Sequence, residues 1–178
     1  MQIDIQKKRN VWLCPASSKD LENTIKNPCI LNMNNESRKL VFLWAFKEGR
    51  KNSWDQMQKG DICIFGNMPE GWRYISIVKE KIYEKDVGSK YLGLERKYAF
   101  TLEFPLNIKI DKNNMRLKLG WTSRGSCIRD CKLNTLKARS LMKYILKKIR
   151  KNYDLLSINN YEKRIVSILQ GISYKDIV

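Results

Sequence analysis

Two tryptophans bracket a short basic segment in the first third of the chain. The segment runs from Lys47 to Ser53, with Trp44 before it and Trp54 after it. Tryptophan rings beside Lys and Arg can stack on a flat ligand while the cations hold its phosphate groups. The same rings can equally fill a core that a strand and a helix share. The residues alone leave both interpretations open, so the surrounding elements have to decide.

The whole chain is strongly basic. Its 178 residues include 35 Lys and Arg against 18 Asp and Glu, which gives a formal charge of +17. An excess of this size favours nucleic acid as the partner. Lys or Arg interrupts every apolar stretch well before the length of about 18 residues that a membrane span needs, and the N-terminus lacks the apolar core of a signal peptide. We therefore expect a soluble, cytoplasmic protein without a membrane partner.

The absence of histidine excludes most common hydrolase designs. Ser-His-Asp triads, Cys-His pairs and HExxH metal helices all need that residue. The five cysteines are an odd and scattered number, typical of reduced thiols, and no glycine-rich phosphate loop occurs. We predict a protein that is not an enzyme and that uses no cofactor and no metal.

A metal-dependent nuclease is the catalytic alternative. Asp86, Glu95 and Lys97 mimic the D…ExK pattern, in which carboxylates hold a metal ion beside a lysine. In a chain with 30% charged residues an ExK triplet arises readily by chance. An exposed strand edge accounts for these residues equally well.

Short strands and small helices are predicted around the tryptophans. The run Val11–Cys14 predicts a strand, residues 17–27 predict a helix capped by Ser17 or Ser18, and the Asn-rich residues 29–39 predict a loop.

The two tryptophans fall on neighbouring elements. The first lies in a β-prone run, Leu40–Phe46, and the second in a short helix predicted over residues 52–60 with Asn52 or Ser53 as its cap. The second tryptophan is predicted to pack on the sheet, whereas Trp72, beside a turn, is predicted to be exposed.

Alternating apolar and polar residues follow. Residues 61–67 and 71–84 predict an antiparallel hairpin, and residues 97–110 continue the pattern with Pro105 at an edge or a bulge. Several short strands with small helices between them predict an α+β fold with a compact, curved β-sheet or partial barrel and small flanking helices.

The composition changes after Cys131. Residues 134–151 have apolar side chains at spacings of three and four, which predicts an amphipathic helix capped by Asn134 or Thr135, and residues 160–171 predict a second helix. The polar face of the first helix has seven Lys or Arg and no acid. This face is either solvated or in contact with phosphates.

A longer stretch around the tryptophans resembles a known superfamily. Residues 43–83, LWAFKEGRKNSWDQMQKGDICIFGNMPEGWRYISIVKEKIY, are similar to the central part of PUA-like domains, which include YTH and EVE domains. The shared pattern is a tryptophan at the end of a strand, a polar stretch, a short helix, an apolar strand, a turn and a returning strand. Leu119–Asn134 further resembles the segment that closes the EVE-like domains of McrB-type modification-dependent restriction subunits.

The resemblance, which covers Val11–Leu133, implies a PUA-like fold and a function. Domains of this kind bind a methylated adenine or cytosine that is flipped out of DNA into an aromatic cage. RNA with a modified base is the alternative ligand, because YTH and PUA domains mostly act on RNA. McrB proteins join the domain to a GTP-driven AAA+ motor that recruits a nuclease, so these are the implied partners. Residues 1–132 are then the base-binding domain, and residues 133–178 are basic helices that lead to an effector domain.

The resemblance also implies the site residues. Trp44 matches the first cage tryptophan, and Trp121 or Phe104 is expected to form the second wall. Their small and polar neighbours are expected to complete the pocket: Ala45, Asn52, Ser53, Thr122 and Ser123. Flanking phosphates are expected to contact nearby cations: Lys47, Arg50, Lys51, Arg116, Lys118 and Arg124.

Overall fold

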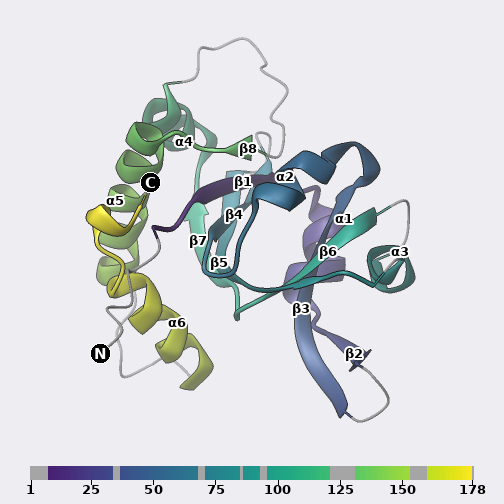
Figure 1. Cartoon of the computed structure of the whole chain (residues 1–178). Helices are drawn as coiled ribbons and strands as arrows, with labels where there is room; N and C mark the ends of the chain where they lie inside the picture. Colours follow the sequence, from purple (N-terminus) through teal and green to yellow (C-terminus); the bar gives the residue numbers. More distant parts are fainter. Residues whose placement is uncertain are drawn as a thin grey trace, which may run out of the picture.

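A curved sheet, to which the described residues contribute eight strands, forms the centre of the protein (Figure 1). The strands lie in the order β2-β3-β6-β5-β4-β1-β8, and β7 pairs with β5 beside that path. The computed structural model describes residues 8–33, 37–67, 71–84, 86–92, 96–120, 131–152 and 160–177. The strands are β1 (Val11–Pro15), β2 (Cys29–Met33), β3 (Ser37–Lys47), β4 (Ile62–Asn67), β5 (Gly71–Ile82), β6 (Arg96–Leu102), β7 (Leu106–Ile110) and β8 (Cys131–Lys132).

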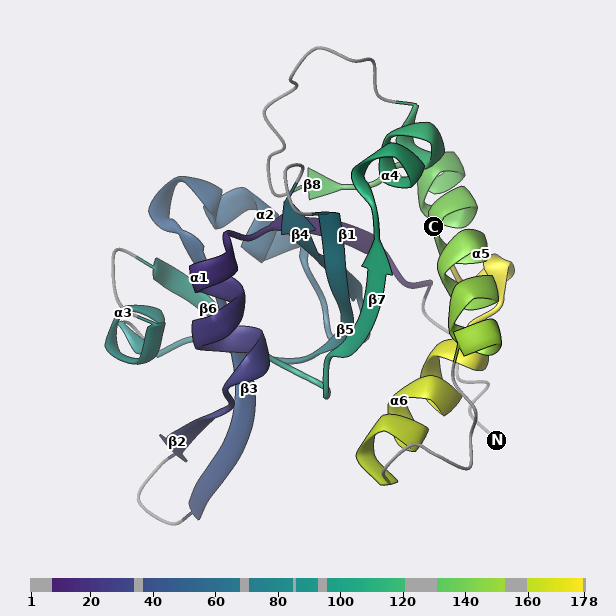
Figure 2. The ribbon, with the colours of Figure 1, turned by 180° about the vertical axis from the view of Figure 1, so that it is seen from behind.

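Helices lie on both sides of this sheet (Figures 1 and 2). The C-terminal helices α4, α5 and α6 cover one side, and α1, α2 and α3 lie on the other. None of the described helices is both long and apolar enough to cross a membrane. The helices are α1 (Ser18–Leu21), continued by a π-helical turn (Glu22–Lys26), α2 (Lys51–Gln56), preceded by a 3-10 turn (Glu48–Arg50), α3 (Val87–Leu92), α4 (Lys112–Leu119), α5 (Thr135–Asn152) and α6 (Asn160–Gln170), with a last 3-10 turn at Tyr174–Asp176.

The long strand β5 curves the sheet because its two ends pair with different strands. Its first part, from Trp72 to Ile75, pairs with β7, whereas its second part, from Val78 to Ile82, pairs with β6. Register shifts interrupt both pairings, and Pro105, which has no N–H to donate, separates β6 from β7. The predicted α+β class with a curved sheet or partial barrel is confirmed.

Strand β1 is buried on both faces. Val11 and Leu13 point into a cluster with the C-terminal helices, while Trp12 and Cys14 point into a cluster with α1 and α2. Successive residues of a strand face opposite sides, so a strand that is covered on both sides is apolar throughout. This burial accounts for the uninterrupted apolar run that predicted the strand, and the prediction is confirmed.

Helix α5 closes the first cluster with its apolar face. Leu141 and Ile145 are fully buried in the same cluster as the β1 residues. The predicted amphipathic helix is confirmed, and Asn134 caps it, since its Oδ1 accepts a hydrogen bond from the Lys137 N–H at 3.0 Å. The C-terminal helices therefore share a core with the sheet, and the division of the chain at residue 132 stays a prediction.

The predicted loop over residues 29–39 is wrong for residues 29–33 and 37–39, and residues 34–36 lie outside the described residues. These residues contribute β2 and the start of β3, which pair with each other in antiparallel fashion. Leu31 is 3% exposed and its neighbour Ile30 is 53% exposed. Alternation between a buried and an exposed side chain is the pattern of a strand, and in β2 it outweighs the turn preference of Asn32.

The helix caps follow the prediction at one position and differ at another. Ser17 caps α1 in a capping box with Asp20, as expected. In α2 the N-cap position belongs to Arg50, and Asn52 and Ser53 lie inside the helix, so the predicted cap is wrong. The physical reason is the 3-10 turn before α2. It continues into the helix without a break, so its last residue, Arg50, occupies the N-cap position.

Asp61 ties the start of β1 to the turn before β4. Its side chain is 2% exposed. The carboxylate accepts hydrogen bonds from Trp12 Nε1 at 2.8 Å, from the Asn10 N–H at 3.0 Å and from the Gln58 N–H at 3.0 Å. Two segments of the chain, the start of β1 and the turn before β4, thus depend on one buried acceptor group.

The Asp61→Ala variant should have a free energy of unfolding about 2–3 kcal/mol lower than the parent, because several buried donors lose their acceptor together. Urea denaturation measures the difference. Asp111→Ala is the matched control, since Asp111 is an exposed N-cap that accepts from two backbone N–H groups of α4, and its loss should cost about 1 kcal/mol. Equal losses in the two variants would contradict the role assigned to Asp61.

Candidate functional site

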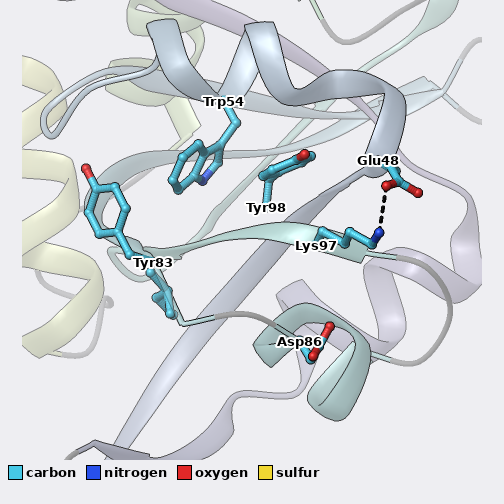
Figure 3. Close-up of a pocket in the computed structure, with 7 residues that line it drawn as sticks. Glu48, Trp54, Tyr83, Asp86, Lys97 and Tyr98 are labelled. Atoms are coloured by element: carbon cyan, nitrogen blue, oxygen red, sulfur yellow. Dashed lines mark hydrogen bonds and ion pairs between the residues drawn. The ribbon is translucent and has the colours of Figure 1, made fainter.

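A pocket of about 450 Å³ opens where α2, the end of β5, β6 and the start of α3 meet (Figure 3). Aromatic rings line one side of it, and charged groups line the other. The lining residues are Glu48, Trp54, Ile82, Tyr83, Asp86, Lys97 and Tyr98.

Three aromatic side chains form the apolar wall. The Trp54 ring meets Tyr83 edge-on, with centroids 5.2 Å apart, and it lies 5.6 Å from the Tyr98 ring at an interplanar angle of 39°. Trp54 is 8% exposed and Tyr83 is 77% exposed. The wall therefore has a fixed base at Trp54 and an open rim at Tyr83, an arrangement suited to a flat apolar ligand.

Helix α2 and strand β6 hold Trp54 in place. The indole Nε1 donates a hydrogen bond to the carbonyl of Ala99 at 3.0 Å, so the polar edge of the ring is satisfied within the protein. The ammonium group of Lys81 lies 4.6 Å from the ring centroid and donates to the carbonyl of Asp55. Partial burial lowers the pKa of Lys81, against the opposing attraction of the Asp55 carboxylate. The ring is thus anchored on its polar edge and through a cation.

The charged side of the pocket contains an ion pair. Glu48 and Lys97 are 2.6 Å apart, and their side chains are 64% and 46% exposed. The hydrogen bond to Glu48 raises the pKa of Lys97. Such an exposed pair contributes little to stability, but it places a hydrogen-bond acceptor and a donor side by side at the pocket. Asp86 completes this side with a left-handed backbone, φ 71°, just before α3.

The structure places Trp44 in the core instead of in this pocket. Its side chain is 2% exposed. The ring of Phe65 packs edge-on against it at a centroid distance of 4.9 Å, and the guanidinium of Arg96 lies 5.5 Å from its centroid. Ala45, the next residue, is 1% exposed and belongs to a different buried cluster. A base could reach Trp44 only if this packing opened.

Among the described residues, Asn52, Ser53 and Phe104 do not line this pocket. Asn52 is exposed on α2, and Ser53 is half-buried beside it. Phe104 packs on Phe42, with ring centroids 5.2 Å apart, and against the cluster of the C-terminal helices. Four predicted site residues lie outside the described residues: Trp121, Thr122, Ser123 and Arg124.

The predicted phosphate-binding cations fall into two groups. Lys47 ends β3 and is exposed, and Arg50 and Lys51 follow in the turn and helix that carry Trp54. These three cations therefore surround the element that forms the pocket wall, although Lys51 is paired with Asp55 at 2.6 Å. The second group, Arg116 and Lys118, lies on α4 on the other side of the sheet.

Sequence reasoning missed two of the three rings. Tyr83 and Tyr98 carry no local pattern that marks them as partners, and the pairing of β5 with β6 is what brings them together. Trp54, predicted to pack on the sheet, does so and also reaches the pocket. Trp72, predicted to be exposed, is fully buried in the cluster with the C-terminal helices, so that prediction is wrong.

The residues of the nuclease alternative come partly together. Asp86 and Lys97 both line the pocket, and Glu95 lies outside the described residues. Among the residues that the structure describes, no group of three or more His, Cys, Asp or Glu side chains could hold a metal ion.

Comparison with models of known protein families gave no match, and neither did comparison with curated proteins. Solved structures do match. The N-terminal domain of Thermococcus gammatolerans McrB bound to m5C DNA superimposes with a TM-score of 0.59 and 14% identity, covering 79% of this chain and 99% of that domain. The YTH domain of Zygosaccharomyces rouxii MRB1 in complex with N6-methyladenosine RNA gives a TM-score of 0.52 and 10% identity, covering 82% of this chain and 93% of that one.

The chain has the fold of these two domains. The resemblance to PUA-like domains of the EVE and YTH type, first seen around the tryptophans, is thereby confirmed for the fold. At 10–14% identity the side chains of the McrB-like and YTH-like fold are largely replaced, so the pocket of this chain has to be judged on its own residues.

Proposed function

We propose that this protein is a non-catalytic DNA-binding module that holds a methylated base, flipped out of the duplex, against the aromatic wall of Trp54, Tyr83 and Tyr98. The observation that carries the proposal is the aromatic pocket, on the fold of two domains whose solved structures contain m5C DNA and N6-methyladenosine RNA. The ligand predicted from the sequence is kept, and the cage is assigned to Trp54 in place of Trp44.

Stacking supplies the free energy that base flipping requires. Unstacking a base costs a few kcal/mol, and stacking on an aromatic side chain returns about 1–3 kcal/mol per base. Trp54 is held against Ala99 and offers a rigid surface, while Tyr83 lies at the exposed rim, where it can cover the base. A methyl group on the base adds apolar area that the rings can bury.

The ion pair at the pocket suits the edge of an adenine or a cytosine. Each of these bases presents an amino donor next to a ring-nitrogen acceptor. The Glu48 carboxylate can accept from the amino group, and the Lys97 ammonium can donate to the ring nitrogen. In this proposal the Glu48–Lys97 pair recognises the hydrogen-bonding edge of the base, and the aromatic rings bind its face.

Binding to a DNA duplex should weaken steeply as salt is added. If five phosphates are neutralised by cations such as Lys47 and Arg50, the slope of log K against log salt should be about −4 to −5, because each contact releases about 0.9 counterion. Fluorescence anisotropy over a salt series measures the slope. A flat response would exclude a nucleic-acid ligand.

The McrB likeness supports a role in modification-dependent restriction. In that role the chain supplies specificity for methylated DNA, and an AAA+ motor and a nuclease supply the movement and the cleavage. A second candidate is a module that binds modified RNA, and the likeness to a YTH domain in complex with N6-methyladenosine RNA favours it.

A set of matched oligonucleotides tests the proposal. Duplex DNA with one m5C, with one N6-methyladenine or with neither, and single-stranded RNA with and without N6-methyladenosine, are compared at one salt concentration. We expect a preference of about tenfold to two-hundredfold for one methylated DNA, the range that a fitted pocket achieves for a methyl group. Preference for the methylated RNA would support the second candidate.

Equal affinity for every methylated and unmethylated pair would overturn the reader proposal. The same oligonucleotides, incubated with the protein and Mg²⁺ and then assayed for cleavage, test the nuclease alternative. Cleavage that disappears in Glu95→Ala would establish that alternative, whereas an intact substrate throughout is the result expected of a non-catalytic module.

A further inference from the structure

The helices on the side of the sheet away from the pocket form a basic surface (Figures 1 and 2). Helices α4 and α5 pack against each other there, whereas the pocket lies beside α2 and α3. Helix α5 has seven Lys or Arg and α4 has three, with no Asp or Glu in either helix. The exposed cations of the two helices, called the α4–α5 face below, are Lys112, Lys118, Lys143, Lys147, Arg150 and Lys151.

Carboxylates neutralise cations elsewhere in the protein. Lys26, Lys51 and Lys97 each form an ion pair with a carboxylate at 2.6–2.7 Å. Within the part of the chain that the structure describes, no cation of the α4–α5 face forms such a pair. The positive charge of this face is therefore available to an external anion.

Concentrating like charges on one helix weakens that helix. Lys147 lies four residues from both Lys143 and Lys151, and like charges at this spacing destabilise a helix. The helix dipole favours cations in the last turn, which accounts for Arg150 and Lys151 but not for Lys143 or Lys147. An arrangement that opposes the stability of its own helix points to a binding function.

The packing of the two helices fixes where these cations lie. The opposite face of α5 is buried against the sheet, so the helix cannot rotate its cations away. The Lys118 ammonium of α4 lies 5.6 Å from the centroid of the Tyr144 ring of α5. Lys148 of α5 donates a hydrogen bond to the carbonyl of Lys109 at the end of β7. The cations are thus presented by a rigid support.

We infer that the α4–α5 face binds the phosphodiester backbone of nucleic acid, at a site separate from the pocket. The helix axis from Lys143 to Lys151 is about 12 Å long at about 1.5 Å per residue. Each DNA strand has one phosphate per about 3.4 Å of duplex axis, so this length, laid along the duplex, matches about three or four phosphates of one strand. The inference shares with the proposed function only the class of ligand, and it needs no modified base.

Neutralising four cations of α5 tests the inference. Lys143, Lys147, Arg150 and Lys151 are all replaced by Gln, which keeps the helix propensity. The control replaces four exposed lysines outside α4 and α5, Lys19, Lys39, Lys59 and Lys79, by Gln. Both variants lower the formal charge by four, from +17 to +13, so any effect of net charge alone is the same in both.

The measurement is binding of an unmodified DNA duplex over a salt series. The α5 variant should bind at least about tenfold more weakly than the control variant, with a log-log slope shallower by about 3–4, because three or four phosphate contacts are lost. Circular dichroism should find both variants as helical as the parent. Equal affinities and slopes in the two variants would overturn the inference.

Two further measurements distinguish nucleic acid from a lipid surface, and the α4–α5 face from the pocket. Sedimentation with phosphatidylserine vesicles tests whether the ligand is a lipid phosphate. If the α5 variant lost vesicle binding but kept the duplex affinity of the parent, the inference would also be overturned. The ratio of affinities for modified and unmodified duplex should be the same in the α5 variant as in the parent. If the parent shows no such preference, the proposed function fails while the test of the α4–α5 face stands.

Discussion

Replacing Trp44 by alanine is expected to lower the free energy of unfolding by about 3–5 kcal/mol, the cost of removing a buried tryptophan from a core. Trp44 is 2% exposed, with Phe65 against its edge and Arg96 against its ring. The cavity would remove the contacts that both of these partners make with the indole ring. For a chain of this size the loss corresponds to a melting temperature lower by about 6–20 °C. Thermal and urea denaturation of the purified variant measure it.

Trp44→Phe is the matched control. The Nε1 atom of Trp44 is buried and has no hydrogen-bond partner among the described residues, so replacing indole by phenyl removes packing but no hydrogen bond to any of them. Trp44→Phe should therefore lose less stability than Trp44→Ala and should keep the full preference for the methylated duplex. A Trp44→Ala protein with unchanged stability and no methyl preference would instead place Trp44 at the ligand.

Tyr83→Ala should lose most of the affinity that distinguishes the methylated duplex from the unmethylated one. Stacking on one aromatic side chain contributes about 1–3 kcal/mol per base, which corresponds to a loss of about five- to 150-fold. Tyr83 is 77% exposed, so its removal should change the free energy of unfolding by no more than about 0.5 kcal/mol. A change in binding without a change in stability is the property that makes this variant informative.

Tyr174→Ala is the control for the Tyr83 variant. Tyr174 is 41% exposed in the C-terminal 3-10 turn and does not line the pocket. The Tyr174→Ala variant loses the same side chain outside the pocket, so its ratio of affinities for methylated and unmethylated duplex should equal that of the parent. If Tyr83→Ala keeps the parent's affinity for methylated duplex, the pocket between Trp54, Tyr83 and Tyr98 is not the base-binding site.

The sequence by itself determined most of the strands and the C-terminal helices. The apolar run of β1 and the three-four spacing in α5 each reflect burial that local geometry imposes on a strand or a helix. Strand β4 was predicted from alternation, but it is buried at every position from Ile62 to Gly66. The resemblance around Trp44 and Trp54 led to the fold that the McrB and YTH domains share. The strand over residues 29–33 was missed because the asparagines in and after it indicated a loop, whereas pairing with β3 makes these residues an edge strand.

Only the tertiary structure decided which aromatic side chains meet. Trp44 and Trp54 belong to the same buried cluster, and their types and neighbours in sequence do not distinguish a core ring from a pocket wall. Antiparallel pairing of Ile82 with Ala99 brings the next residues, Tyr83 and Tyr98, to the same end of the sheet, and Trp54 donates to the carbonyl of that same Ala99. Strand pairing fixes contacts between residues that are distant in the chain, and local patterns do not specify which partner a strand will find.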